Sequence, residues 1–160
     1  KYNEKIITEF SDSVGAQGVI AGQVSDLSAE DQKASEELLK YIHINKTAKL
    51  IKASVKIGAL VSNASTEQIN KLSSYGEKIG LAFQIKDDIL DKLSSSQKIG
   101  KSVNSDTSKG KMTYPSVYGL KKSEVIMKEL VNESIDEINS LDIDTKILKK
   151  IARYVIEREN

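Results

Sequence analysis

Apolar residues recur along most of the chain at intervals of three or four, the spacing that places them on one face of an α-helix. No run alternates convincingly between apolar and polar residues as a strand would, and proline occurs only at Pro115. The pattern therefore predicts an all-α chain. The first three stripes contain Ile7, Phe10, Val14, Ala21 and Val24, then Leu39, Ile42, Lys46, Leu50, Ala53, Ile57 and Leu60, and then Ile69, Leu72, Gly76, Ile79, Phe83, Asp87 and Leu90.

Short polar signals mark where some of these helices begin and end. Residues Ser28–Asp31, "SAED", resemble a capping box with aspartate in place of glutamate, and Ser65–Gln68, "STEQ", is a capping signature. The helix that "STEQ" opens is expected to end near Leu93. A loop rich in Ser, Lys and Gly is expected over residues 92–115, and a loop of that length is usually functional or disordered.

The last third of the chain is also expected to be helical. Pro115 suits the first turn of a short helix that Gly119 would end. Two amphipathic helices are predicted after it. Glycines 15, 18 and 22, which weaken the first stripe, are expected where this part of the chain packs closely against another helix.

Composition narrows the function classes. The chain has 160 residues, enough for one domain with a sizeable core, and its 24 Lys and Arg nearly balance its 23 Asp and Glu. That balance gives no global basic field, so nucleic-acid binding is not expected. The absence of cysteine excludes disulfides and thiol chemistry, and no apolar run could span a bilayer. These absences favour a soluble, cytoplasmic protein.

Four polar residues form a ridge on the third expected helix. Gln84, Asp87, Asp88 and Asp91 stand at i, i+3, i+4 and i+7, and Asp87 also falls on the apolar stripe. Carboxylates placed together repel one another and resist desolvation, so a divalent cation would stabilise them. Oxygen ligands without His or Cys favour Mg²⁺. A solvated acidic helix end is the alternative for the same residues.

Lysine forms a second candidate constellation. Lys46 lies within an apolar stripe, where an unpaired ammonium is costly. The "GKS" at residues 100–102 is not a phosphate-binding P-loop, because Ser95 stands where that motif needs Gly and no strand precedes it. Solubility explains most of the lysines in the expected loop. The only histidine, His43, is interpreted as a packed or surface residue rather than a general base.

Taken in order, these segments resemble motifs of the all-trans prenyl diphosphate synthases. "GQVSDL" (22–27) resembles GQ-x-x-D-L, "HINKTAKLI" (43–51) resembles H-x-x-K-T-G-x-L-I, and "GLAFQIKDDILD" (80–91) resembles the second aspartate-rich motif. Residues 100–120 resemble the G-K-x-x-G-x-D-x-x-x-G-K-x-T-Y-P segment, and "YVIERE" resembles the usual bacterial C-terminus. The departures are Ala48 and Asn104, where the family usually has Gly.

The resemblance implies that residues 1–160 form the C-terminal portion of a single polyprenyl synthase domain, part of the all-α isoprenoid synthase bundle. The resemblance also implies that the N-terminal half, with the first aspartate-rich motif and the isopentenyl diphosphate site, is not included in these 160 residues. The full-length enzyme is expected to be a homodimer. The chain alone is expected to be inactive, and its product chain length cannot be read.

The reaction implied by the resemblance is 1'-4 condensation of isopentenyl diphosphate with an allylic diphosphate, in the manner of a farnesyl diphosphate synthase (geranyltranstransferase). Mg²⁺ is the implied cofactor, bound directly by Asp87 and through water by Asp88 and Asp91. The other implied site residues are Lys46, Lys101, Lys111 and Gln84 on the diphosphate, with Thr47 and Gln84 also facing the developing allylic cation.

Two other function classes stay open. One is a non-catalytic helical subunit or interaction module that retains the fold, although the aspartates and lysines of the motifs are present. The other is a terpene cyclase, but those enzymes usually have N-D-x-x-S-x-x-x-E as the second metal motif, which "DDILD" does not match.

Overall fold

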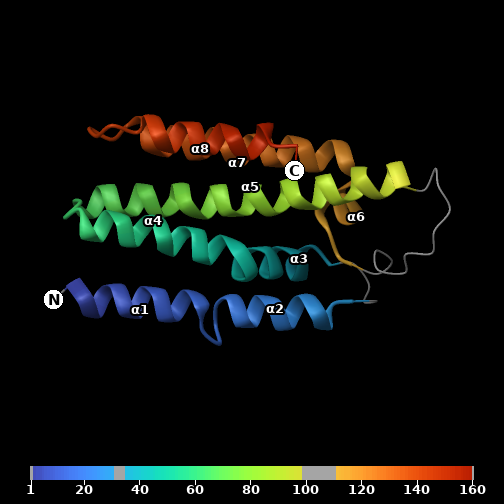
Figure 1. Ribbon diagram of the computed structural model, residues 1–160, viewed down its shortest axis with the longest axis horizontal. Helices are drawn as coiled ribbons and strands as arrows, with labels where there is room; N and C mark the ends of the chain where they lie inside the picture. Colours follow the sequence, from blue (N-terminus) through green and yellow to red (C-terminus); the bar gives the residue numbers. More distant parts are fainter. Residues whose placement is uncertain (1, 31–34, 99–110, 160) are drawn as a thin grey trace.

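The computed structural model describes residues 2–30, 35–98 and 111–159. Within these ranges every regular element is a helix, as the apolar spacing predicts (Figure 1). The elements are α1 (Tyr2–Val14), α2 (Val19–Ser28), α3 (Glu36–His43), the π-helix η1 (Ile44–Ala48), α4 (Lys49–Val61), α5 (Thr66–Lys98), α6 (Tyr114–Tyr118), α7 (Leu120–Asn139) and α8 (Lys146–Glu157).

The helices lie in rows on either side of α5, which has 33 residues. Figure 1 shows α5 between the row formed by α3, η1 and α4 and the pair α7 and α8. α1 and α2 form a further row, where α1 packs on α4 and α2 packs on η1 and α3. α5 is therefore the central helix, in contact with η1, α4, α6, α7 and α8.

The core follows from this central position. The most deeply buried residues of α5 recur every three or four positions, and they pack with buried residues of α7 and α8. Three apolar residues of the predicted stripe, Ile69, Phe83 and Leu90, are only half-buried. The reason is that α5 is covered on two sides, so a single stripe does not describe its buried surface. The buried large apolar residues and alanine of α5 are Leu72, Tyr75, Ile79, Ala82, Ile85 and Ile89.

Two predicted helix ends are confirmed by their hydrogen bonds. The Ser65 amide donates to Gln68 Oε1 at 2.8 Å and the Gln68 amide donates to Ser65 Oγ at 3.2 Å, which is a capping box at the start of α5. Pro115 lies in the first turn of α6, and Gly119 ends that helix with φ of 79°, a conformation that favours glycine. These interactions join residues close in sequence, which is why the sequence could reveal them.

Two other predicted boundaries are wrong. Ser28 is the last residue of α2, and α3 begins after Ser35, whose side chain accepts a hydrogen bond from the Leu38 amide at 3.4 Å. α5 continues to Lys98 rather than ending near Leu93. Residues 92–98 contain neither Gly nor Pro, so nothing in their backbone opposes the helix.

No helix within the described ranges is both long and apolar enough to cross a bilayer.

Candidate active site

The π-helix η1 holds Lys46 and Thr47 between two neighbouring helices. A Cβ atom at Gly22 of α2 would lie 2.2 Å from the Lys46 backbone nitrogen, and one at Gly80 of α5 would lie 2.6 Å from Ala48 Cα. Both glycines are therefore needed for this close approach, as expected for Gly22 from its weak helix propensity. Single π turns inside α-helices are frequent at functional sites.

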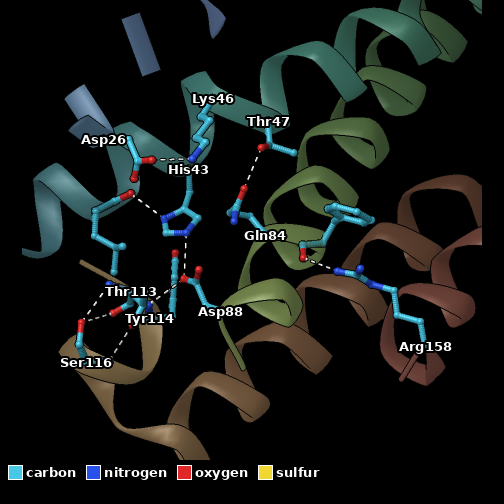
Figure 2. A network of polar contacts seen from close by, with 12 residues as sticks. Asp26, His43, Lys46, Thr47, Gln84, Asp88, Thr113, Tyr114, Ser116 and Arg158 are labelled. Atoms are coloured by element: carbon cyan, nitrogen blue, oxygen red, sulfur yellow. Dashed lines mark hydrogen bonds and ion pairs between the residues drawn. The ribbon is translucent and has the colours of Figure 1, made fainter. Parts of the chain in front are cut away.

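The Lys46 ammonium has the partner that its place in an apolar stripe requires. Its Nζ lies 2.5 Å from Oδ2 of Asp26 on α2, and the two side chains are 26% and 16% exposed (Figure 2). Asp26 is the aspartate of the "GQVSDL" segment, but the local pattern does not reveal that it pairs with a lysine 20 positions away. The ion pair fixes the ammonium at the end of α2 while leaving part of it accessible.

Thr47 and Gln84 are joined across η1 and α5. The Thr47 hydroxyl donates to Gln84 Oε1 at 2.8 Å (Figure 2). This bond orients the side-chain amide of Gln84, which lines an open pocket. Both side chains are half-buried, so they sit where polar groups could face a bound substrate.

An open pocket of ≈ 470 Å³ brings most of the predicted site residues together. It combines two ammonium groups with three carboxylates and one amide, contributed by η1, by α5 and by residues outside the helices. Glu159, near the chain end, was not predicted. Lys101 lies outside the described residues. The polar residues that line the pocket include Lys46, Gln84, Asp87, Asp91, Lys111 and Glu159.

Asp87 is held by an arginine from the end of the chain. Arg158 Nη2 forms an ion pair with Asp87 Oδ1 and donates to the Phe83 carbonyl oxygen at 2.9 Å. The guanidinium also lies over the Phe83 ring, 3.9 Å from its centroid. Arg158 belongs to "YVIERE", but its contact with Asp87 spans 71 positions, and no sequence signal announces it.

Asp88 points away from this pocket. Its side chain is 3% exposed, and His43 Nε2 lies 2.9 Å from Asp88 Oδ2. The Tyr114 amide donates to the same oxygen at 3.0 Å. His43 is thus a buried, packed residue, as the sequence suggested. Burial, followed by the nearby carboxylates of Asp88 and Glu36, raises the pKa of the Tyr114 phenol to about 12, so this ring stays uncharged.

The carboxylates of the pocket suit Mg²⁺ that is also bound to a phosphate ligand. In the described part of the chain, no group of three or more His, Cys, Asp or Glu residues is arranged to hold a metal ion. Asp87 and Asp91, however, border the same pocket as two ammonium groups. Mg²⁺ commonly binds one or two carboxylates together with substrate phosphates and waters. The pocket therefore suits a metal shared with a phosphate ligand rather than a cage made by this chain alone.

Curated proteins resemble this chain over almost its whole length. The chain is 40% identical over 157 residues to a geranylgeranyl diphosphate synthase of Cyanophora paradoxa, covering 98% of this chain and 52% of that protein. It is 35% identical over 162 residues to the mitochondrial geranylgeranyl pyrophosphate synthase 6 of Arabidopsis thaliana, covering 98% and 48%. The chain thus spans about half the length of the curated relatives it matches.

Solved structures with a similar fold also cover almost the whole chain. A candidate farnesyl-diphosphate synthase from Marinomonas sp. MED121 superposes with a TM-score of 0.82 at 35% identity, covering 97% of this chain and 52% of that one. A geranyltransferase from Helicobacter pylori, complexed with magnesium and isoprenyl diphosphate, has a TM-score of 0.75 at 28% identity, covering 98% and 51%. The polyprenyl synthetase family profile matches residues 1–152. This chain is therefore a member of the polyprenyl synthetase family, with the helical fold of the isoprenoid synthases.

Proposed function

We propose that this chain supplies the C-terminal half of a prenyltransferase catalytic domain that condenses an allylic diphosphate with isopentenyl diphosphate. The single observation that carries the proposal is the pocket, where Lys46 and Lys111 face Asp87 and Asp91. Cations and metal-binding carboxylates around one open space match the needs of diphosphate departure. The Helicobacter relative bound to magnesium and isoprenyl diphosphate supports the same ligand class.

The proposed roles follow from the positions of the side chains. Lys46 and Lys111 bind the allylic diphosphate, joined by Lys101, which lies outside the described residues. Gln84 assists them, and the Thr47 hydroxyl that bonds to Gln84 keeps its amide oriented.

The metal roles fall to two carboxylates. Asp87 and Asp91 hold Mg²⁺ at the pocket, whereas Asp88 is enclosed by His43 and Tyr114 and supports the site without contacting the metal. When bound, the metal neutralises the charge that develops on the leaving diphosphate. The chain's own groups orient the diphosphate and keep the allylic portion near the Gln84 and Thr47 dipoles.

Apolar surface on two helices supports the proposal that a further half is required. Ile57 and Phe83 are half-buried, but five large apolar residues on α1 and α2 are between 52% and 64% exposed. Large apolar side chains exposed three or four positions apart on each of two helices are typical of an interface. We propose that the family's N-terminal half covers it, and that the chain alone is inactive. The five residues are Ile7, Phe10, Ile20, Val24 and Leu27.

Complementation tests this proposal. The chain is incubated with Mg²⁺, isopentenyl diphosphate and geranyl diphosphate, alone, mixed with the N-terminal half of the Cyanophora paradoxa relative, and fused to it. Extended product is expected only when that half is supplied. Turnover by the chain alone, at the rate of a full-length relative, would contradict the proposed division of the domain.

The same experiment separates the alternative function. A fusion that folds and associates but forms no product would favour a non-catalytic helical subunit. Product length would be read directly from the active fusion, which decides between a farnesyl and a longer product. The homodimer and the cytoplasmic location stay predictions. The relatives include proteins described as mitochondrial and chloroplastic, so location varies within the family.

A further inference from the structure

The Asp88 carboxylate is part of a buried network rather than of the pocket wall. One of its oxygens, Oδ2, accepts two contacts, from His43 Nε2 at 2.9 Å and from the Tyr114 amide at 3.0 Å. The His43 and Asp88 side chains are 4% and 3% exposed. Figure 2 shows the three groups converging from α3, α5 and the start of α6. Asp88 could turn to the pocket only by leaving both partners unpaired.

His43 is fixed from three directions. Its Nδ1 lies 2.9 Å from the Leu39 carbonyl oxygen, its Nε2 faces Asp88, and its ring meets the Tyr114 ring edge-on, with centroids 5.2 Å apart. Each ring nitrogen therefore has an oxygen partner within hydrogen-bonding distance. A side chain so enclosed cannot touch a ligand in the pocket, so any effect of His43 on the site is transmitted by its neighbours.

The segment that His43 and Asp88 hold is the strap, defined as residues 111–118. Met112, Tyr114 and Pro115 of the strap are buried, whereas Lys111 is exposed and lines the pocket. A reciprocal pair of hydrogen bonds between Thr113 and Ser116 closes the start of α6. The Thr113–Ser116 pair does not use the Tyr114 amide. That amide donates a hydrogen bond to Asp88 instead.

Fixing Tyr114 restricts Lys111 because the two residues are only three positions apart. Such a segment spans at most about 10–11 Å even when fully extended. The buried Met112 side chain between them, 6% exposed, limits the path further. The position of the Lys111 ammonium over the pocket therefore depends on the anchor at Tyr114.

We propose that His43 and Asp88 form a clamp that positions the strap, so that His43 controls how well Lys111 binds an anion without touching that anion. The diphosphate class of the anion rests on the proposed function, whereas the clamp itself rests only on the contacts above. The acidic ridge then has two tasks. Asp87 and Asp91 border the ligand pocket, and Asp88 holds the strap that brings Lys111 to it.

The first test needs no substitution. In the unmodified 160-residue chain, amide hydrogen exchange at Tyr114 should be slow, because the amide is buried and donates to a buried carboxylate. The exposed Ser116 provides the comparison within the same short helix. Exchange at Tyr114 as fast as that of an unprotected amide would overturn the clamp. This measurement is independent of catalysis, so it stands even if complementation yields no product.

The second test measures transmission to Lys111. The probe is inorganic diphosphate with Mg²⁺, titrated calorimetrically into the chain and its variants. His43→Leu should weaken binding by about tenfold, as should Lys111→Ala, and the double variant should be no weaker than either single one, because both act through the same ammonium. In His43→Leu the Tyr114 amide should also lose protection. Additive effects, or unchanged Tyr114 protection, would overturn the proposal.

Two further variants separate positioning from general loss of stability. His43→Gln retains an amide donor that can reach Asp88, so it should recover most of the diphosphate affinity, and it is the working variant if His43→Leu fails to fold. Tyr75→Phe is the matched control, because it removes a partly buried hydrogen bond of 2.8 Å that the Tyr75 hydroxyl of α5 donates to the Leu148 carbonyl of α8. It should lower stability and leave diphosphate affinity unchanged. Equal loss of affinity in Tyr75→Phe would assign the His43 effect to stability alone.

Discussion

Two neighbouring carboxylates of α5 lie in opposite surroundings. The Asp87 side chain is 36% exposed, borders the pocket and pairs with Arg158. The Asp88 side chain is 3% exposed and is enclosed by His43 and Tyr114. Successive residues of an α-helix point about 100° apart, so adjacent positions meet different neighbouring elements. An aspartate-rich motif is therefore not a single cluster, because the helix directs its members to different tasks.

The pocket side of α5, which carries Asp87 and Asp91, and its strap side, which carries Asp88, should also respond differently to substitution. On the pocket side, carboxylates are partly hydrated and available to a ligand, so their loss should affect catalysis first. On the strap side, removal of a carboxylate leaves buried donors without an acceptor, so stability should fall first.

The largest effect is expected for Asp88→Ala. Each buried donor left without an acceptor typically costs about 1–3 kcal/mol of unfolding free energy, and here His43 and the Tyr114 amide would both lose theirs. Urea denaturation followed by circular dichroism measures the change. Asp91→Ala is the matched control, because its exposed side chain should alter stability by less than about 0.5 kcal/mol. A loss for Asp88→Ala as small as that of the control would erase the distinction between the two sides.

Asp87→Ala should act mainly on catalysis. We expect turnover of the complemented domain to fall by about 10²- to 10³-fold, the size of loss seen when a group that stabilises transition-state charge is removed. Asp91→Ala should cost less. Rates are measured at saturating Mg²⁺, and Asp87→Asn, which keeps an acceptor for Arg158, is measured in parallel to exclude a folding defect. Turnover at the unsubstituted rate in Asp87→Ala would remove Asp87 from the metal site.

Arg158→Met tests how firmly the pocket side is held. The variant loses the hydrogen bond to the Phe83 carbonyl and the pair with Asp87. Hydrogen bonds to charged groups contribute about 1.5–3 kcal/mol, so a loss of unfolding free energy in that range is expected. A double-mutant cycle with Asp87→Ala, which leaves Arg158 no acceptor at position 87, isolates the share that depends on Asp87. Zero coupling in the cycle would mean that the two side chains do not interact in solution.

The smallest effect is expected for Thr47→Val. The substitution preserves shape and removes the hydroxyl that donates to Gln84, so a loss of about 1 kcal/mol in unfolding free energy is expected. Ser54→Ala is the control, because its exposed hydroxyl bonds only within its own helix, to the Leu50 carbonyl. Equal changes in the two variants would show that the link between η1 and α5 adds nothing beyond a local hydrogen bond.

Much of the fold was predictable because its signals are local. The three- and four-residue spacing predicted helices in each part of the chain, and the caps at Ser65 and Pro115 involve residues within one turn. The two wrong boundaries, at Ser28 and near Leu93, arose where a polar segment was compatible with more than one ending. The lack of Gly and Pro in residues 92–98 allowed the helix to continue.

The site was predictable as a set of residues but not as a set of contacts. The motifs identified Lys46, Gln84, Asp87, Asp91 and Lys111, and all of these line one pocket. Asp88 belongs to the same motif, but its surroundings depend on α3 and α6. The contact of Asp87 with Arg158 joins residues 71 positions apart. No local pattern encodes such a pairing.

The sequence by itself determined the helical class, several helix ends and the residue types that suit a phosphate and a divalent cation. These properties depend on side-chain periodicity and on hydrogen bonds within a turn, which operate over a few residues. Only the tertiary structure decided that Lys46 pairs with Asp26, that Arg158 holds Asp87, and that Asp88 turns to His43 and the strap. The physical reason is that the sequence sets only the direction in which a side chain leaves its helix. The neighbouring helices determine whether that side chain is buried and which polar partners it can reach.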